Sequence, residues 1–139
     1  MKIYFQQESF DQSSILDNFS RKNKTSGSII SFIGKVRELR EKQKIKNIEI
    51  EFYKNMAFFQ AEKSLKNLEK KITVDDYLIF HRYGKLFPGE NIILVLVASQ
   101  HRKEGFEFTQ EVILYFKKKI TFWKKENYLQ NSKWLDSQN

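Results

Sequence analysis

Basic side chains recur at a few places in the sequence, and one cluster has a spacing that suggests chemistry. Lysines at positions 117–119 close a segment whose apolar residues repeat at helical spacing. At about 100° per residue, Lys118 points away from the apolar side, Lys119 lies on its flank and Lys117 lies at its edge. A lysine at such an edge partly buries its stem, and burial beside other cations lowers the pKa of its amine. We therefore predict that Lys117 is the lysine of this triplet that a binding pocket would use.

The alternative for this triplet is a solvated helix end, where positive charge is favoured by the helix dipole. That alternative accounts for Lys118 and Lys119, but it does not address the basic residues elsewhere. Lys35 and Arg37 are two residues apart in SFIGKVR, so they project from the same face of an extended strand. Gly34 before them indicates either a bulge or the close approach of a ligand.

A second basic pair follows the aliphatic run at residues 91–99. His101 and Arg102 stand at the expected junction between this strand and the next helix, where free backbone N–H groups favour anions. Arg gives bidentate contacts and Lys a movable point charge, which suits a phosphorylated small molecule or a carboxylate. We predict that one concave site collects these groups, which are Lys35, Arg37, His101, Arg102, Lys117, Lys124 and Glu126.

The elements that must position these residues follow from the apolar pattern. Strands are predicted at 2–7, 28–37, 47–53, 77–82 and 91–99, the last being central and fully covered. One helix is predicted from a cap at Ser9 or Asp11 to residue 19 and another at 56–71, with Phe58 in the core. The third helix is predicted to bury Phe106, Val112, Ile113, Phe116 and Ile120. The charged residues 38–46 are predicted to be a mobile loop, and 122–126 with 133–136 a closing hairpin around Asn131 and Ser132.

Composition limits the class of protein. A chain of 139 residues that is 40% hydrophobic and contains thirteen Phe predicts one packed domain, residues 1–139. The expected strands and helices make this domain α+β, with a mostly antiparallel sheet. The net charge of +8 favours an anionic partner. No cysteine is present, which excludes disulfides, thiolate metal sites and a persulfide carried on this chain, and two histidines make a zinc site unexpected. No segment is long and apolar enough to span a bilayer, so we expect a soluble, cytoplasmic protein without a membrane partner, metal or cofactor.

Four segments in a fixed order carry a resemblance to a known family. They are SFIGKVR, HRYGKLFPGE, ASQHRKEGFE and YFKKKITFWKKE, and from about residue 27 to 134 the chain resembles the large subunit of molybdopterin synthase. The resemblance implies an α/β-hammerhead-like fold and a sulfurtransferase of molybdenum cofactor biosynthesis, which converts cyclic pyranopterin monophosphate to the dithiolene of molybdopterin. It implies that the sulfur arrives as a thiocarboxylate on the C-terminal Gly-Gly of a separate small carrier subunit. It also implies a homodimer of large subunits within a heterotetramer.

The resemblance assigns roles to individual residues. Lys117 matches the essential lysine near the thiocarboxylate, and Lys124 matches a second lysine with a catalytic role. The implied substrate-binding residues are Lys35, Val36, Arg37, His101, Arg102, Lys117, Lys124, Lys125 and Glu126. Thr121 departs from the proline that the family often has there, and Gln138 stands where some relatives carry a basic residue that reaches the neighbouring subunit's site. The lack of cysteine and of a terminal Gly-Gly agrees with sulfur that is delivered from outside.

Two other classes compete with this interpretation. A basic nucleic-acid-binding module would interleave aromatics with Lys and Arg on an exposed sheet face, but most Phe residues here fall at core spacing, so we expect no nucleic acid as partner. A catalytically silent scaffold would bind substrate without turnover. The aliphatic residues 92–97 and the late hairpin also predict an apolar sheet edge, and hence a homodimer.

Overall fold

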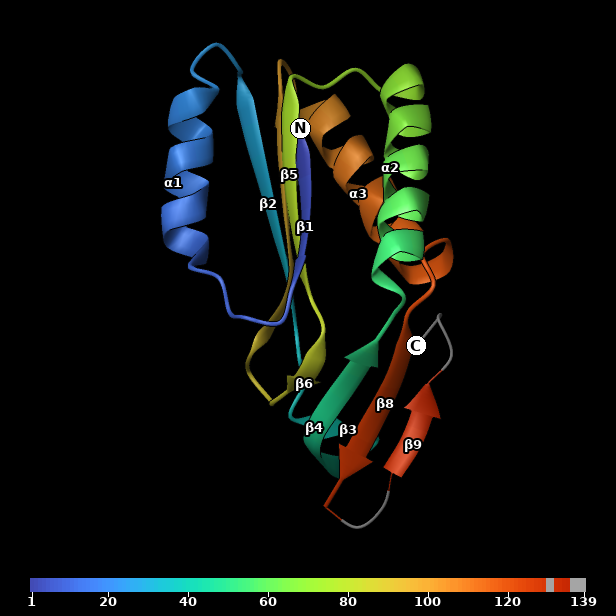
Figure 1. Cartoon of the computed structure of the whole chain (residues 1–139). Coiled ribbons are helices and arrows are strands. Elements are labelled where there is room, and N and C mark those ends of the chain that lie inside the picture. Colours follow the sequence, from blue (N-terminus) through green and yellow to red (C-terminus); the bar gives the residue numbers. More distant parts are fainter. Residues whose placement is uncertain (130–131, 136–139) are drawn as a thin grey trace.

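The computed structural model describes residues 1–129 and 132–135. In chain order its elements are β1 Lys2–Gln6, α1 Gln12–Lys22, β2 Ser28–Lys35, β3 Leu39–Arg40, β4 Gln43–Glu51, α2 Lys54–Lys71, β5 Asp76–Arg82, β6 Gly84–Leu86, β7 Asn91–Ser99, α3 Arg102–Lys118, β8 Trp123–Tyr128 and β9 Ser132–Leu135. They form two sheets joined end to end, with the helices beside the first sheet (Figure 1). The predicted α+β class is confirmed. None of the helices in the described residues is long and apolar enough to cross a membrane.

The first sheet has the strand order β1-β5-β7-β2, in which only β1 and β5 run parallel. Helix α1 covers one face, and α2 and α3 cover the other (Figure 1). Alternate residues of β7 therefore enter different clusters: Val95 and Val97 face α2 and α3, whereas Leu94 and Leu96 face α1. All four are fully buried, which confirms the central, covered strand. Because β7 is paired on both sides, it offers no free edge, and the homodimer argument drawn from residues 92–97 is wrong.

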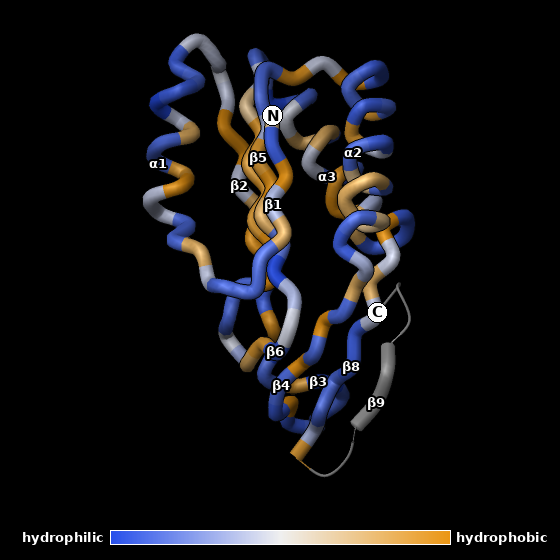
Figure 2. Tube along the Cα trace, in the orientation of Figure 1, coloured by the Kyte–Doolittle hydropathy of each residue, from blue (hydrophilic) through white to orange (hydrophobic). Residues whose placement is uncertain are grey.

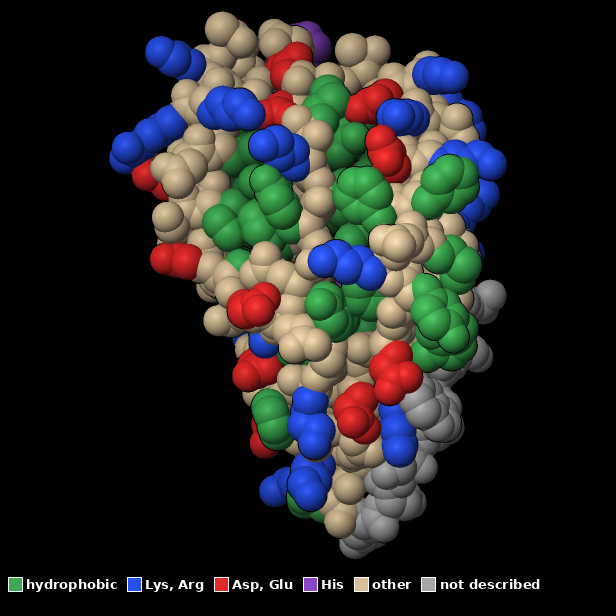
Figure 3. Space-filling view, in the orientation of Figure 1, with side chains coloured by type: hydrophobic (Ala, Val, Ile, Leu, Met, Phe, Trp, Pro, Cys, Tyr) green, Lys and Arg blue, Asp and Glu red, His purple; other side chains and the backbone are tan. Residues whose placement is uncertain are grey.

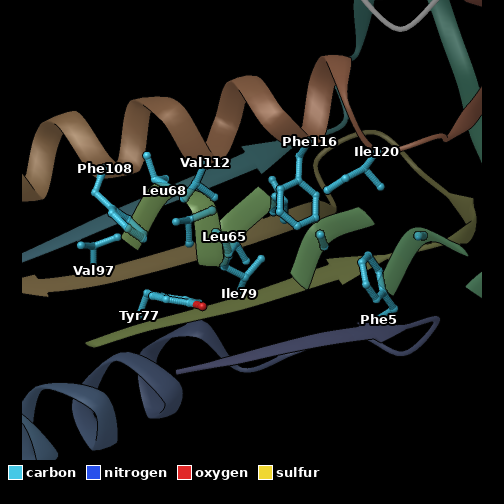
Figure 4. Close-up of a cluster of buried hydrophobic side chains, with 14 residues drawn as sticks. Phe5, Leu65, Leu68, Tyr77, Ile79, Val97, Phe108, Val112, Phe116 and Ile120 are labelled. Atoms are coloured by element: carbon cyan, nitrogen blue, oxygen red, sulfur yellow. The ribbon is translucent and has the colours of Figure 1, made fainter. Parts of the chain in front are cut away.

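The main core lies between this sheet and the two helices α2 and α3. Figure 4 shows Phe108, Val112 and Phe116 pointing from α3 toward the strands. Phe106, which the helical spacing of apolar residues predicted to be buried, is instead 59% exposed, and Phe108 is fully buried. The helix turns this way because Gly105 packs closely on the sheet, where an added Cβ would lie 2.8 Å from Ser99 Oγ. In α2 the buried positions are Ala57, Ala61, Leu65 and Leu68, so the prediction of a buried Phe58 is also wrong.

The second sheet has the order β3-β4-β8-β9, with β6 paired to β4. Residues 38–46 form the β3–β4 hairpin here rather than a mobile loop. Its turn residues, Glu41 and Lys42, have φ of 49° and 68°, the left-handed conformation that two-residue hairpin turns use. The hairpin is anchored by Ile45 and Ile48, which are buried in a second cluster. Figure 2 shows the mixed hydropathy of this sheet, in contrast to the apolar centre of the first one.

Three smaller predictions concern the glycine at the end of β2, the C-terminal hairpin and the cap of the first helix. The pairing of β2 with β7 shifts register between Gly34 and Lys35, so the glycine marks a bulge, and an added Cβ would lie 2.8 Å from Ile93 Cγ2. The expected C-terminal hairpin is present as β8 paired with β9. Asn131, Asp136 and Gln138 lie outside the described residues. At the other end, Asp11 rather than Ser9 caps α1, because its Oδ1 accepts a hydrogen bond from Ser14 N at 3.2 Å.

Candidate functional site

A hollow of about 400 Å³ opens between the two sheets and the C-terminal end of α3. Its floor is apolar and consists of Val36, Ile45, Ile48 and Ile92, of which the first three are buried. Its polar lining is almost entirely cationic and consists of Lys35, Arg37, Lys117, Lys124 and Glu126. We call this site the basic hollow. An apolar floor under several cations suits a small anion that carries a flat ring.

Short backbone contacts fix the segment that carries Arg37. Val36 N donates to Glu90 O, and Gly89 N donates to Val36 O, both at 2.9 Å. The PGE turn that follows β6 therefore holds the end of β2 in place, with Gly89 at a φ of +87°. Lys35 and Arg37 themselves are exposed on either side of the buried Val36, at the rim of the basic hollow.

The two lysines on the opposite side come from different elements. Lys117 belongs to the last turn of α3 and is exposed, whereas Lys124 belongs to β8 and is only partly exposed. Burial, and then the charge of Lys117, lower the pKa of Lys124, while Glu126 acts in the opposite direction. The sequence pattern did not single out Lys124 as a lysine whose pKa burial lowers. An amine with a lowered pKa exchanges protons more readily near neutral pH.

Glu126 is a buried carboxylate with both oxygens engaged. Arg40 Nη1 lies 2.9 Å from its Oε1, and the hydroxyl of Tyr128 donates to its Oε2. Burial and this hydrogen bond raise the pKa of Tyr128 to about 12. Sequence reasoning missed both partners. The available signal was the two-residue spacing of Glu126 and Tyr128, which places them on one face of β8.

His81 lies behind the basic hollow and was also missed. It is 3% exposed, and its ring stacks on Phe122 with centroids 4.4 Å apart and on Phe116 at 5.6 Å. Its Nδ1 lies 2.8 Å from Arg82 O and carries the proton, because a carbonyl oxygen only accepts. Burial, and then the charge of Lys124, lower the pKa of His81 to about 3. The imidazole is therefore neutral at physiological pH.

Three residues assigned to substrate binding lie elsewhere in the chain. His101 and Arg102 line a second hollow of about 590 Å³ at the start of α3, together with Gly27, Ser28, Gln100 and Lys103. Lys125 alternates with Lys124 and Glu126 on β8 and does not line the basic hollow. One chain therefore brings six of the nine residues together, namely Lys35, Val36, Arg37, Lys117, Lys124 and Glu126.

A metal site and a nucleic-acid-binding surface are two other kinds of site to compare with the described residues. Within residues 1–129 and 132–135, no group of three or more histidine and acidic side chains is placed to hold a metal ion. On the face shown in Figure 3, lysine and arginine side chains are interspersed with acidic ones, and apolar side chains gather over the first sheet. Because charges of both signs are mixed there, this face does not present the continuous basic surface of a nucleic-acid-binding protein.

Comparison with known proteins identifies a family. Residues 5–119 match the family described as MoaE protein. A molybdopterin synthase catalytic subunit from Ralstonia nicotianae is 37% identical over 115 residues, which are 80% of this chain and 63% of that protein. The corresponding subunit from Brucella melitensis is 32% identical over 127 residues, 91% of this chain and 77% of its own length.

Solved structures agree with the sequence relatives. The molybdopterin synthase from Staphylococcus aureus superposes with a TM-score of 0.85 at 27% identity, covering 97% of this chain and 98% of that one. A Helicobacter pylori complex of subunits 1 and 2 of molybdopterin-converting factor gives a TM-score of 0.78 at 19% identity, with 95% and 88% covered, which shows the fold alone. The resemblance seen in the four sequence segments is confirmed, and the nucleic-acid-binding alternative finds no support in these comparisons.

Proposed function

The chain belongs to the MoaE protein family, and from this we propose that it is the catalytic subunit of a molybdopterin synthase. It would transfer sulfur to cyclic pyranopterin monophosphate and form the dithiolene of molybdopterin, as a sulfurtransferase of molybdenum cofactor biosynthesis. The observation that carries the proposal, beyond the family, is the basic hollow with Lys117 and Lys124 on one wall. A cytoplasmic location is part of the same proposal, and cell fractionation tests it.

The basic hollow suits this substrate in size, floor and charge. Its volume of about 400 Å³ lies in the range of small-molecule sites. A pterin ring would lie on the floor of Val36, Ile45 and Ile48. Arg37 would hold the cyclic phosphate through the two parallel hydrogen bonds that a guanidinium offers, and Lys35 would add a point charge beside it.

The two lysines would act on the reacting groups. The thiocarboxylate sulfur attacks a carbon of the substrate and displaces an oxygen leaving group there, which leaves the carrier joined to the substrate as a thioester. Water then adds to the acyl carbon of this thioester, negative charge develops on the acyl oxygen, and the carrier's C–S bond breaks, so that the sulfur stays on the substrate and the carrier leaves as its carboxylate. Lys124 would stabilise this oxyanion, and its partly buried position strengthens the interaction by excluding water. Lys117, which is exposed at the mouth of the hollow, would position or protonate groups around the attacked carbon.

The sulfur donor in this proposal is a small subunit with a C-terminal Gly-Gly thiocarboxylate. The Helicobacter pylori complex was solved with two subunits together, which is the kind of pairing proposed. Exposed aromatic side chains at the starts of β8 and α2, where a separate hollow lies, provide apolar contact surface. Tyr53 and Trp123 meet edge-on with ring centroids 5.6 Å apart, and Phe59 of α2 is 66% exposed.

A homodimer within a heterotetramer is part of the same proposal. In such a dimer, His101 and Arg102 of one copy could contact the substrate bound in the other copy. In one chain they line the second hollow, so a second copy would have to bring them to the basic hollow. Mixing Lys117→Ala and Arg102→Ala chains tests this idea. Mixed dimers would regain one intact site if sites are shared, whereas two inactive chains that stay inactive after subunit exchange would refute sharing.

Reconstitution tests the proposed activity itself. The purified chain, a thiocarboxylated small subunit and cyclic pyranopterin monophosphate should together yield the dithiolene. The matched control uses the same small subunit with an ordinary carboxylate, which has no sulfur to transfer. Substrate binding without product in the complete mixture would favour the silent scaffold, and salt-sensitive binding of generic RNA instead of the pterin would favour the nucleic-acid module.

A further inference from the structure

The position of Glu126 beside Lys124 poses a question about charge. The two residues are two apart on β8, so their side chains leave the same face about 7 Å apart along the strand. Both line the basic hollow. A carboxylate this close would ordinarily pair with the ammonium and hold it in its charged form. The hydrogen bonds and the ion pair of Glu126 are instead made with other residues.

Each oxygen of Glu126 has a partner from another part of the second sheet. Oε1 contacts Arg40 Nη1 at 2.9 Å, and Oε2 accepts the hydrogen bond from the Tyr128 hydroxyl. The contacts are sheltered, because the side chain of Glu126 is 4% exposed and that of Arg40 is 15% exposed. Strand β4 pairs with β3 on one side and with β8 on the other, so the β3–β4 hairpin carries Arg40 across to Glu126.

We propose that Arg40 and Tyr128 are positioning residues for the catalytic lysine. By holding both oxygens of Glu126, they keep this carboxylate from pairing with Lys124 and leave the Lys124 amine free to act on substrate. The inference rests on the proposed function for its catalytic meaning, but the arrangement of charge can be measured without it.

Apart from Glu126, the charged side chains that line the basic hollow around Lys124 are cations. Lys117 approaches from α3, Lys35 and Arg37 from the end of β2, and the neutral ring of His81 from β5. Among the described residues that line the basic hollow, Glu126 is the only carboxylate. The orientation of this one group therefore decides whether Lys124 has an anionic partner. Its influence already opposes the lowering of the Lys124 pKa by burial and by Lys117.

Two substitutions release Glu126 in different ways. Tyr128→Phe removes one hydroxyl and no charge, so it isolates the hydrogen bond to Oε2. Arg40→Met removes the ion pair at Oε1, and Arg40→Lys should restore much of it. The matched control is Arg21→Met, which breaks an exposed Arg–Asp17 pair of 2.9 Å in α1, far from the basic hollow in the sequence and on another element.

The experiment is a pH titration of lysine side-chain NMR signals in the full chain labelled with carbon-13 and nitrogen-15 at lysine. The Lys124 signal is identified by its loss in Lys124→Arg. We expect the pKa of Lys124 to rise in Tyr128→Phe, and by about 1 to 3 units in Arg40→Met, the range that a newly available opposite charge produces. Arg40→Lys and Arg21→Met should titrate like the wild-type chain.

A melting curve accompanies each variant, so that unfolding is recognised. If Arg40→Met does not fold, Tyr128→Phe decides, because the loss of one hydroxyl leaves the ion pair in place. An unchanged Lys124 titration in a folded variant would overturn the inference, even if the wild-type chain makes the dithiolene. A raised Lys124 pKa in a chain that makes no dithiolene would instead uphold the role of Glu126 and refute the proposed function.

Discussion

His81 should make the stability of this protein sensitive to mild acid. Its ring is 3% exposed, stacks on Phe122 and is held neutral, with a pKa lowered to about 3 by burial and by the charge of Lys124. In the unfolded chain the same ring would titrate at its ordinary pKa of 6.5. Between these values the unfolded state binds a proton that the folded state does not bind. Stability is therefore complete above pH 6.5 and falls as the pH drops toward 3.

The size of the effect follows from the two pKa values. A difference from about 3 to 6.5, at about 1.36 kcal/mol per pH unit, corresponds to about 5 kcal/mol of unfolding free energy in total. At pH 5 about 2 kcal/mol of this would already be lost. That loss is a large part of the stability of a typical small domain.

Urea unfolding at pH 7.5 and at pH 5 measures the loss. His81→Phe keeps a flat ring between Phe116 and Phe122 but cannot titrate. Between pH 7.5 and pH 5 the wild-type chain should therefore lose about 2 kcal/mol more unfolding free energy than this variant loses. The sequence has one other histidine, His101, which is exposed. His101→Asn is the matched control and should behave like the wild-type chain. If the wild-type chain and His81→Phe lose the same stability between these pH values, then His81 is not a buried neutral ring and the reasoning fails.

Two further predictions concern packing. Phe108→Ala should lower the unfolding free energy by about 3–5 kcal/mol because Phe108 is fully buried, whereas Phe106→Ala on the same helix should change it by less than about 0.5 kcal/mol; urea denaturation of both variants checks this. Gly34→Ala should cost about 1–3 kcal/mol, because the added Cβ would lie 2.8 Å from Ile93 Cγ2, and the double variant with Ile93→Ala should lose less than the two single losses combined when thermal melting is compared.

The elements that the sequence predicted well are those whose pattern reports burial directly. Strand β7 is a run of aliphatic residues because both of its faces are covered, and α2 shows its buried stripe at helical spacing. The local pattern gave a wrong prediction where a tertiary contact determines which side chain is buried. Phe106 and Phe108 are equally apolar, and the close packing of Gly105 on Ser99 fixes which of them turns inward.

The same limit applies to the candidate site. Motif and spacing singled out Lys117, Lys124 and Arg37, which line one hollow. The charged residues 38–46 resembled a loop because Glu41 and Lys42 lack the Asn-Gly signal of a tight hairpin turn. The contact of Arg40 with Glu126 joins residues 86 positions apart, so no local pattern reports it. The lowered pKa of Lys124 likewise depends on burial between separate elements.

The most direct test of the proposed site compares two adjacent lysines of α3. Lys117 lines the basic hollow, whereas Lys118, which is also exposed and carries the same charge, does not. In single-turnover dithiolene formation with the thiocarboxylated carrier in excess, Lys117→Ala should be slower by at least about 100-fold, the scale of a positioned acid–base group. Lys118→Ala should stay within a few-fold of the wild-type rate, with melting curves showing that both variants fold. Equal losses in the two variants would mean that only overall charge matters, and they would contradict the assignment of the basic hollow as the place of sulfur transfer.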